Sequence, residues 1–363
     1  MKPYRFISFL IVGINGKPEE PFPRCAECVP NSIYNAPGVG FGLSFSSGSA
    51  AIHLNNSTVL DIALVSASPD YMTLMARLVA SPKPPPLSRW SKWRRSVNKK
   101  LGRPATADVG TLADMLISLR NATSAAIASP LDRVSVAHQP IPGLTEYDLS
   151  DALEYAGLRP WLSSELPRPK IGWPPLPEAG MYPTHLTEGH AVFAAHGHGL
   201  CESYKNLFDC WEEEEKMPVE MVLVAGFTKG DLRAEAMRIG VPFDWFQNVM
   251  ERFVDLTAGL DAIDKFDSEE AFWAYIRNRL EELVTRLPSR LTMVLLTGEE
   301  ATHPRFLGSL RDALVNGTEK ALVVDGQGGV INPAFAHARG AAQYSRWRQE
   351  APVGCEEPEN CSH

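Results

Sequence analysis

The 363-residue sequence lacks an apolar run long enough to span a bilayer, which predicts a soluble protein. It also lacks an excess of positive charge. The 35 Lys and Arg residues against 43 Asp and Glu residues leave a formal net charge of −8, which argues against a nucleic-acid partner. A disordered chain would have few apolar residues, whereas here 44% of the residues are hydrophobic and 21% are charged. The composition is that of a globular protein.

Familiar catalytic and metal-binding patterns are missing as well. The sequence has no Gly-x-Ser-x-Gly elbow, so it gives no support to a conventional hydrolase. Four histidines lie between His185 and His198, but they include no i,i+4 pair and no carboxylate at a known spacing. We therefore expect packing or surface roles for these histidines and no metal site.

The first 37 residues are predicted to form an irregular leader. Lys2 and Arg5 precede an apolar run from Phe6 to Ile14, a pattern typical of a secretory signal over residues 1–16. The β-branched residues of the same run also allow an N-terminal strand. We expect a secretory or extracellular location, with a cytoplasmic location as the alternative.

The cysteines favour the secretory interpretation, because an even number in close pairs is typical of disulfide loops in an oxidising compartment. The three pairs are Cys25/Cys28, Cys201/Cys210 and Cys355/Cys361, the last in a predicted tail over residues 351–363. Cys25 and Cys28 could alternatively form a redox or zinc half-site. Glycosylation sequons, which also suit secretion, begin at Asn55, Asn56, Asn121, Asn316 and Asn360.

Strand and helix patterns alternate along the chain, which indicates an α/β architecture. Predicted strands lie at Val39–Ser46, Ser49–Leu54, Val59–Leu64, Arg133–Ala137, Met221–Ala225 and Met293–Leu296. Predicted helices lie at Thr111–Ile127, Leu144–Ala156, Thr187–His198, Pro242–Leu256, Ser268–Leu287 and Asn332–Ala342. The proline-rich residues from Trp161 to Pro183 are predicted to be a linker or a long loop.

The segment from Arg89 to Arg103 carries seven basic residues and no acidic one. One interpretation is a surface that binds nucleic acid or an anionic membrane. The other is an ordinary amphipathic helix, because Trp90, Trp93, Val97 and Leu101 recur at helical spacing. We expect the second, with this apolar stripe docked on the body of the protein and the charges in solvent.

Five groups of residues, taken in order, resemble the nucleotide-binding domain of the seventy-kilodalton heat-shock chaperones. In chain order they are Gly40–Ser46, Ala156–Leu158, Glu188–Gly197, Val222–Gly230, and the pair Val294–Glu299 with Asn332–Ala342. The resemblance makes Gly40–Ser46 and Val222–Gly230 the two phosphate loops and Glu188–Gly197 the crossing helix. It makes the last pair the adenosine turn and the final helix. The resemblance covers roughly residues 38–348. It implies a bilobal actin-like ATPase fold, which is ribonuclease H-like, with two lobes around a central cleft and no chaperone substrate domain.

The same resemblance implies lobe I at residues 38–183, lobe II at 184–330 and a final helix at 331–350 that returns to lobe I. ATP or ADP would then lie against Gly298, Glu299 and Gly340 on the adenosine side, and against Gly42, Ser44, Thr228, Lys229 and Gly230 on the phosphate side. The alternative is that Gly298 and Gly340 serve only close packing between strand and helix.

Both phosphate loops depart from the family pattern at positions that carry the chemistry. Gly42 and Gly226 stand where the family has metal-handling aspartates, and Ser44, Phe45, Thr228 and Lys229 replace glycines or a threonine. Phosphoryl transfer depends on positioning and electrostatic stabilisation, so these losses predict a pseudo-ATPase that binds a small molecule or a protein partner. Lys229 could replace the lost metal charge.

Two other functions remain open. Phe45 and Phe227 would make the cleft less polar, so it could serve a small-molecule enzyme, for example a cofactor-independent cyclase of a specialised metabolic pathway. Alternatively, an active chaperone-like ATPase could use Asp231 or Asp325 to hold its metal.

Overall fold

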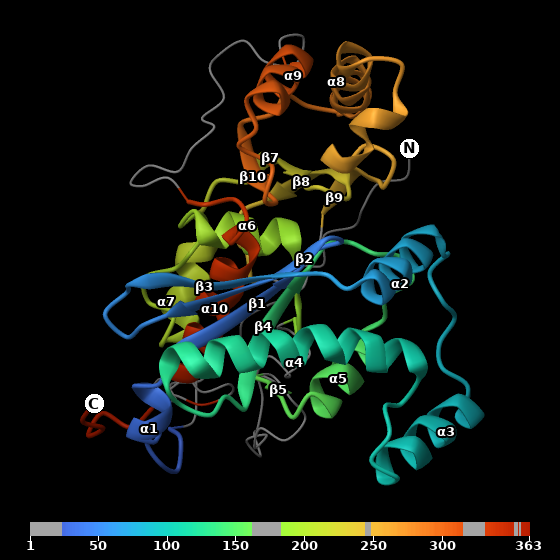
Figure 1. The fold of residues 1–363 in the computed structure, drawn as a ribbon. Helices are drawn as coiled ribbons and strands as arrows, with labels where there is room; N and C mark the ends of the chain where they lie inside the picture. The colour runs from blue at the N-terminus through green and yellow to red at the C-terminus, as the bar shows by residue number, and fades with distance from the viewer. Residues whose placement is uncertain (1–23, 162–182, 244–247, 315–330, 352–354, 356) are drawn as a thin grey trace, which may run out of the picture.

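The structure is a computed structural model that describes residues 24–161, 183–243, 248–314, 331–351, 355 and 357–363. It has a mixed α/β fold with two mixed sheets (Figure 1). The predicted signal segment, the interior of the predicted 161–183 loop, and Asp325 lie outside the described residues. Within the described residues, no helix has both the length and the hydrophobicity needed to cross a membrane.

The first sheet has the strand order β3-β2-β1-β4-β5, and β6 also pairs with β4. Its strands are β1 (Gly38–Leu43), β2 (Ser47–His53), β3 (Val59–Ser66), β4 (Arg133–His138), β5 (Arg159–Pro160) and β6 (Leu186–Thr187). The first three strands are antiparallel neighbours, and β4 runs parallel to β1. Every residue of β1 and β2 is buried, so both faces of the sheet centre are covered.

The two faces of β1 carry different residues because side chains alternate along a strand. Val39, Phe41 and Leu43 join the core that includes residues of α2 (Pro69–Ala80), α4 (Ala107–Ile127) and α5 (Glu146–Tyr155). The alternate residues are glycines that face α10 (Ala336–Glu350). A Cβ on Gly40 would lie 2.1 Å from the backbone nitrogen of Ala342, so only glycine lets this helix rest directly on the sheet.

The second sheet has the order β10-β7-β8-β9. Strands β7 (Glu220–Phe227), β8 (Leu232–Ile239) and β9 (Val249–Asp255) are antiparallel neighbours, and β10 (Met293–Thr297) runs parallel to β7. Residues of α8 (Glu269–Thr285) and α9 (Pro304–Leu314) share a core with β7, β8 and β10. Both sheets thus contain three successive antiparallel strands and a later strand that pairs in parallel with the first.

The remaining helices are α1 (Asn31–Tyr34), α3 (Arg89–Lys100), α6 (Glu188–Ala195), α7 (Leu207–Glu214) and the 3₁₀ helix η1 (Leu260–Lys265). Helix α6 crosses α10, and Gly340 lies at the crossing, where a Cβ would lie 1.8 Å from the Ala191 carbonyl oxygen. Figure 1 shows α6 between the two groups of strands, and α10 overlaps the first sheet in this view.

The predicted helix at Pro242–Leu256 is wrong, because β9 occupies Val249–Asp255, and β8 was not predicted at all. The residues of β8, Leu-Arg-Ala-Glu-Ala-Met-Arg-Ile, have mostly high helix propensity. Backbone pairing with β7 on one side and β9 on the other overrides that preference. The other predicted strands and helices are confirmed with ends that differ by a few residues, except that the last helix, predicted at Asn332–Ala342, extends to Glu350.

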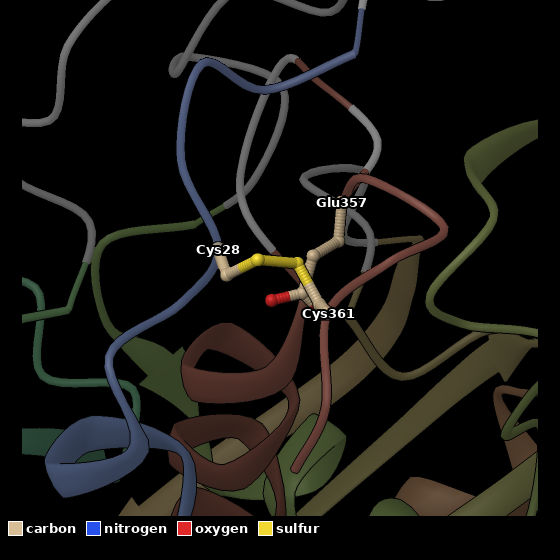
Figure 2. A group of neighbouring side chains, drawn as sticks. All are labelled: Cys28, Glu357 and Cys361. Atoms are coloured by element: carbon tan, nitrogen blue, oxygen red, sulfur yellow. A yellow bond between two sulfur atoms is a disulfide. The ribbon is translucent and has the colours of Figure 1, made fainter.

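Two of the three predicted disulfide loops are wrong. The bonds join Cys25 to Cys355 and Cys28 to Cys361, and only Cys201–Cys210 pairs locally as expected. A redox or zinc half-site at Cys25 and Cys28 is excluded by the same pairing. Figure 2 shows the Cys28–Cys361 bond beside Glu357, whose Oε1 accepts from the backbone nitrogen of Val29 at 2.7 Å. The two terminal segments therefore lie side by side.

We predict that the two terminal disulfides stabilise the fold as one unit. They span 330 and 333 residues, so either bond alone keeps the long loop closed. Replacing all four cysteines by serine should lower the free energy of unfolding by about 5 kcal/mol, and Cys28→Ser with Cys361→Ser by much less. Urea denaturation of both variants would measure this difference. Equal losses would contradict the prediction, and the Cys201–Cys210 pair serves as the short-loop control.

Candidate functional site

Two turns meet where the sheets approach one another. The first joins β1 to β2 and contains Phe45 and Ser46, and the second joins β7 to β8 and contains Thr228 to Asp231. They are in direct contact, because a Cβ on Gly230 would lie 2.6 Å from the Phe45 ring. These are the two segments that the resemblance identifies as phosphate loops.

Glu299 bridges the two turns. Its Oε1 accepts from the Ser46 hydroxyl at 2.7 Å and from the backbone nitrogen of Lys229 at 3.2 Å, and its Oε2 accepts from the Ser47 hydroxyl at 3.4 Å. A carboxylate of the chain itself therefore takes donors from both turns. In phosphate-binding loops, backbone N–H groups such as that of Lys229 donate hydrogen bonds to oxyanions in the same way.

The other polar groups of the turns are used internally. The Thr228 hydroxyl oxygen accepts from the backbone nitrogens of Gly230 at 3.1 Å and Asp231 at 3.0 Å, and the Ser44 hydroxyl donates to the Ser47 carbonyl at 2.8 Å. Lys229 contributes its backbone nitrogen, and its side chain is exposed to solvent. Among the described residues the Lys229 ammonium has no ion-pair partner, so its role as a replacement for a metal charge stays a prediction.

Arg233 of β8 forms a buried ion-pair network beside the second turn. Its Nε and Nη2 donate to the two carboxylate oxygens of Glu188, both at 2.6 Å, and its Nη1 donates to Asp231 Oδ2 at 2.9 Å. All three side chains are at most 4% exposed. Fork-like pairing of a guanidinium with a carboxylate is the strongest common geometry for such a contact.

The two carboxyl groups respond differently to this environment. Burial alone would raise the pKa of Glu188, but the charge and hydrogen bonds of Arg233 outweigh it and the pKa is lowered. For Asp231 burial outweighs the contribution of Arg233, so its pKa is raised. Glu188 and Arg233 thus form the ionised pair, and Asp231 is the carboxyl group more easily protonated.

His337 extends the network from α10. Its Nε2 lies 3.5 Å from the Ser49 hydroxyl and its Nδ1 lies 3.4 Å from the Thr297 hydroxyl, which itself donates to Glu188 Oε1 at 2.9 Å. Burial lowers the pKa of His337 and favours the neutral imidazole. The network therefore joins α6, α10, β8, β10 and β2.

The glycines that replace the expected aspartates make room for these side chains. A Cβ on Gly42 would lie 1.9 Å from the His337 ring, and a Cβ on Gly226 would lie 2.6 Å from Cγ of Arg233. An aspartate at either position cannot coexist with the observed neighbour. The packing of His337 and Arg233 therefore requires glycine at positions 42 and 226.

The other expected contact residues have packing roles. Gly298 adopts a φ of +99°, its nitrogen donates to the Pro333 carbonyl at 3.0 Å, and a Cβ there would lie 2.4 Å from the Phe227 carbonyl oxygen. Gly340 lies at the crossing of α6 and α10. Phe227 is fully buried and stacks on Phe306 in the second core, so it does not make a cleft less polar as expected.

Sequence reasoning did not single out Arg233, Glu188 or His337 as site residues. The available signal was alternation along β8, where Arg233, Glu235 and Met237 alternate with Leu232, Ala234 and Ala236. This alternation is informative only if the segment is recognised as a strand, and its helix-favouring residues do not indicate one.

Two groups of described residues combine cysteines with a carboxylate at metal-like spacing: Cys28, Glu357 and Cys361, and Cys201, Cys210 and Glu214. In both groups the sulfurs are joined in a disulfide, so neither offers a thiolate; Figure 2 shows the first group.

No protein-family model matches the chain, and a comparison with the curated proteins finds no match.

We predict that Arg233 is essential to the stability of the junction. Arg233→Met would leave Glu188 and Asp231 buried without their cation and should lower the free energy of unfolding by about 3–5 kcal/mol. Arg238→Met, on an exposed position of the same strand, should change it by less than about 0.5 kcal/mol. Chemical denaturation measures both. Similar losses in the two variants would show that the buried pair has no special role.

A second prediction concerns Glu235, which is 5% exposed and has an Oε1 without a hydrogen-bond partner among the described residues. Burial raises its pKa from 4.5 to about 7. The unfolded chain then ionises first, so the free energy of unfolding should fall by roughly 3 kcal/mol as pH rises from 4.5 to 7. Glu235→Gln should remove that fall, whereas the exposed control Glu270→Gln should keep it. Denaturant unfolding curves between pH 4.5 and 7 measure this dependence. The same pH dependence of stability in both variants would contradict the prediction.

Proposed function

We propose that this chain is a bilobal protein of the actin-like ATPase fold that has lost ATP hydrolysis and acts as a binding scaffold. One observation carries the proposal: the guanidinium of Arg233 lies between Glu188 and Asp231, with its Nε and Nη2 on the first and its Nη1 on the second. Because these carboxylates already pair with a permanent cation of the chain, this observation supports the loss of metal-dependent hydrolysis.

The sheet topology supports the fold assignment. Each sheet has three antiparallel strands followed along the chain by a strand parallel to the first, as expected of two related lobes. Helix α10 follows the second sheet in sequence but packs against β1, β2 and β4 of the first. The predicted return of a final helix to lobe I accords with this arrangement.

The chemistry of the junction supports the loss of hydrolysis. A working site needs free backbone donors for phosphate oxygens and carboxylates free to hold hydrated Mg²⁺. Here Glu299 already accepts from both turns, and Asp231 is engaged with Arg233. The alternative of an active ATPase that holds its metal with Asp231 is disfavoured, because Asp231 already pairs with Arg233. Asp325, the other residue suggested for the metal, lies outside the described residues.

The small-molecule enzyme alternative has less support. Its physical basis was an apolar cleft lined by Phe45 and Phe227, but Phe227 belongs to the core of the second sheet and Phe45 packs on Gly230. For the location we propose secretion, because all six cysteines are disulfide-bonded and such bonds persist in oxidising compartments.

We predict that the unmodified protein shows neither Mg²⁺-dependent ATP binding by isothermal titration nor phosphate release above background. Glu299→Ala should release the donors of Ser46 and Lys229 and produce measurable ATP affinity, since backbone N–H groups would become available to phosphate oxygens. The neighbouring Glu300→Ala is the matched control and should remain inert. Tight Mg²⁺-dependent binding with steady turnover by the unmodified protein would refute the proposal.

A further inference from the structure

Helix α3 is attached to the protein through its polar face. Arg95 is buried and donates from Nε to Asp151 at 2.7 Å and from Nη2 to Asp148 at 2.9 Å, both residues of α5. Lys99 also pairs with Asp151, at 2.9 Å. In a typical surface helix the charged side faces solvent, but in α3 the side with Arg95 and Lys99 contacts α5.

The apolar stripe of the same helix faces solvent, contrary to expectation. Trp90, Trp93 and Leu101 are 66%, 55% and 63% exposed, and the two indole rings stack with centroids 4.7 Å apart. At 3.6 residues per turn these three residues share one side of the helix, and the half-buried Val97 lies between them. The ion pairs of Arg95 and Lys99 prevent α3 from rolling this stripe onto the body.

Unpaired cations border the stripe. Arg89, Arg94, Lys100 and Arg103 are exposed, and none has an ion-pair partner among the described residues. A pocket of about 620 Å³ between α3 and the start of α4 includes Trp90, Arg94 and Arg103 in its lining. We refer to Trp90, Trp93, Arg94, Lys100, Leu101 and Arg103 together as the α3 face.

We propose that the α3 face binds the surface of an anionic phospholipid bilayer. Indole rings favour the membrane–water interface, and flanking Lys and Arg residues are attracted to anionic headgroups. The exposed cations give this face a charge that complements anionic headgroups, although the whole chain has a net charge of −8. Figure 1 places α3 at an outer corner of the molecule, where a flat surface can reach it.

The composition of the stripe favours lipid over nucleic acid. A single-stranded nucleic acid would use exposed aromatic rings as separate platforms for its bases. Here Trp90 and Trp93 stack on one another, and Leu101 extends the stripe with an aliphatic side chain. A continuous apolar stripe between two rows of cations is typical of a helix that lies in a membrane interface.

The test is flotation of the full chain with vesicles of phosphatidylcholine alone or with about one third phosphatidylserine. We expect binding to the anionic vesicles, weakened at least severalfold when salt is raised from about 0.1 M to 0.5 M. Binding to neither vesicle overturns the proposal. Equal binding to both also overturns it, as does binding to a single-stranded oligonucleotide in preference to anionic vesicles.

Variants assign the binding to the α3 face. Trp90→Ser with Trp93→Ser, and separately Arg94→Glu with Lys100→Glu, should each reduce the partition coefficient about tenfold or more. The controls are Trp211→Ser, at a tryptophan that is 51% exposed on α7, and Lys265→Glu on η1, each expected to stay within about twofold. Unchanged thermal unfolding must accompany each loss. Equal losses in variants and controls would place the binding elsewhere.

Discussion

The structure depends on one buried cation. Arg233 neutralises Glu188 directly and holds Asp231, and all three side chains are almost fully removed from water. Removing such charges from water costs several kcal/mol per ion, so the arrangement is stable only because each oxygen and nitrogen has a well-placed partner. Since Glu188 begins α6 and Arg233 belongs to β8, this requirement fixes how the crossing helix meets the second sheet.

Close helix packing makes the same junction possible. The glycines of β1 bring α10 onto the first sheet, and Gly340 brings α6 onto α10. These approaches place His337 against Gly42 and within reach of Thr297, which contacts Glu188. Backbone contacts thus position the polar groups, and the polar groups in turn tolerate only glycine at positions 42 and 226.

Sequence patterns could predict those parts of the fold in which one periodicity prevails. The alternation of β1 to β3 and the 3.6-residue pattern of α4 and α8 gave correct elements. Strand β8 and the terminal disulfides could not be found this way, because long-range pairing rather than local preference decides them. The exposure of Trp90 depends likewise on Asp148 and Asp151, which lie more than fifty residues away.

Several residues that the resemblance implied as nucleotide contacts lie close together, but a nucleotide site there stays a prediction. Gly42, Ser44, Thr228, Lys229, Gly230 and Glu299 do lie along or beside the meeting of the two turns. The sequence could not reveal that Glu299 satisfies the turns or that Arg233 reaches Glu188, because both contacts join segments more than forty residues apart.

An internal cation and an internal anion differ from a bound metal nucleotide in one respect: they cannot dissociate. A nucleotide clamp lets two lobes open and close as the ligand binds and leaves, whereas Arg233 and Glu299 belong to the chain and stay at the junction whether or not a ligand is present. Under the proposed function the junction is therefore a permanent structural link. Recognition would then have to use a different surface, and the α3 face is one that combines exposed aromatic rings with unpaired charge.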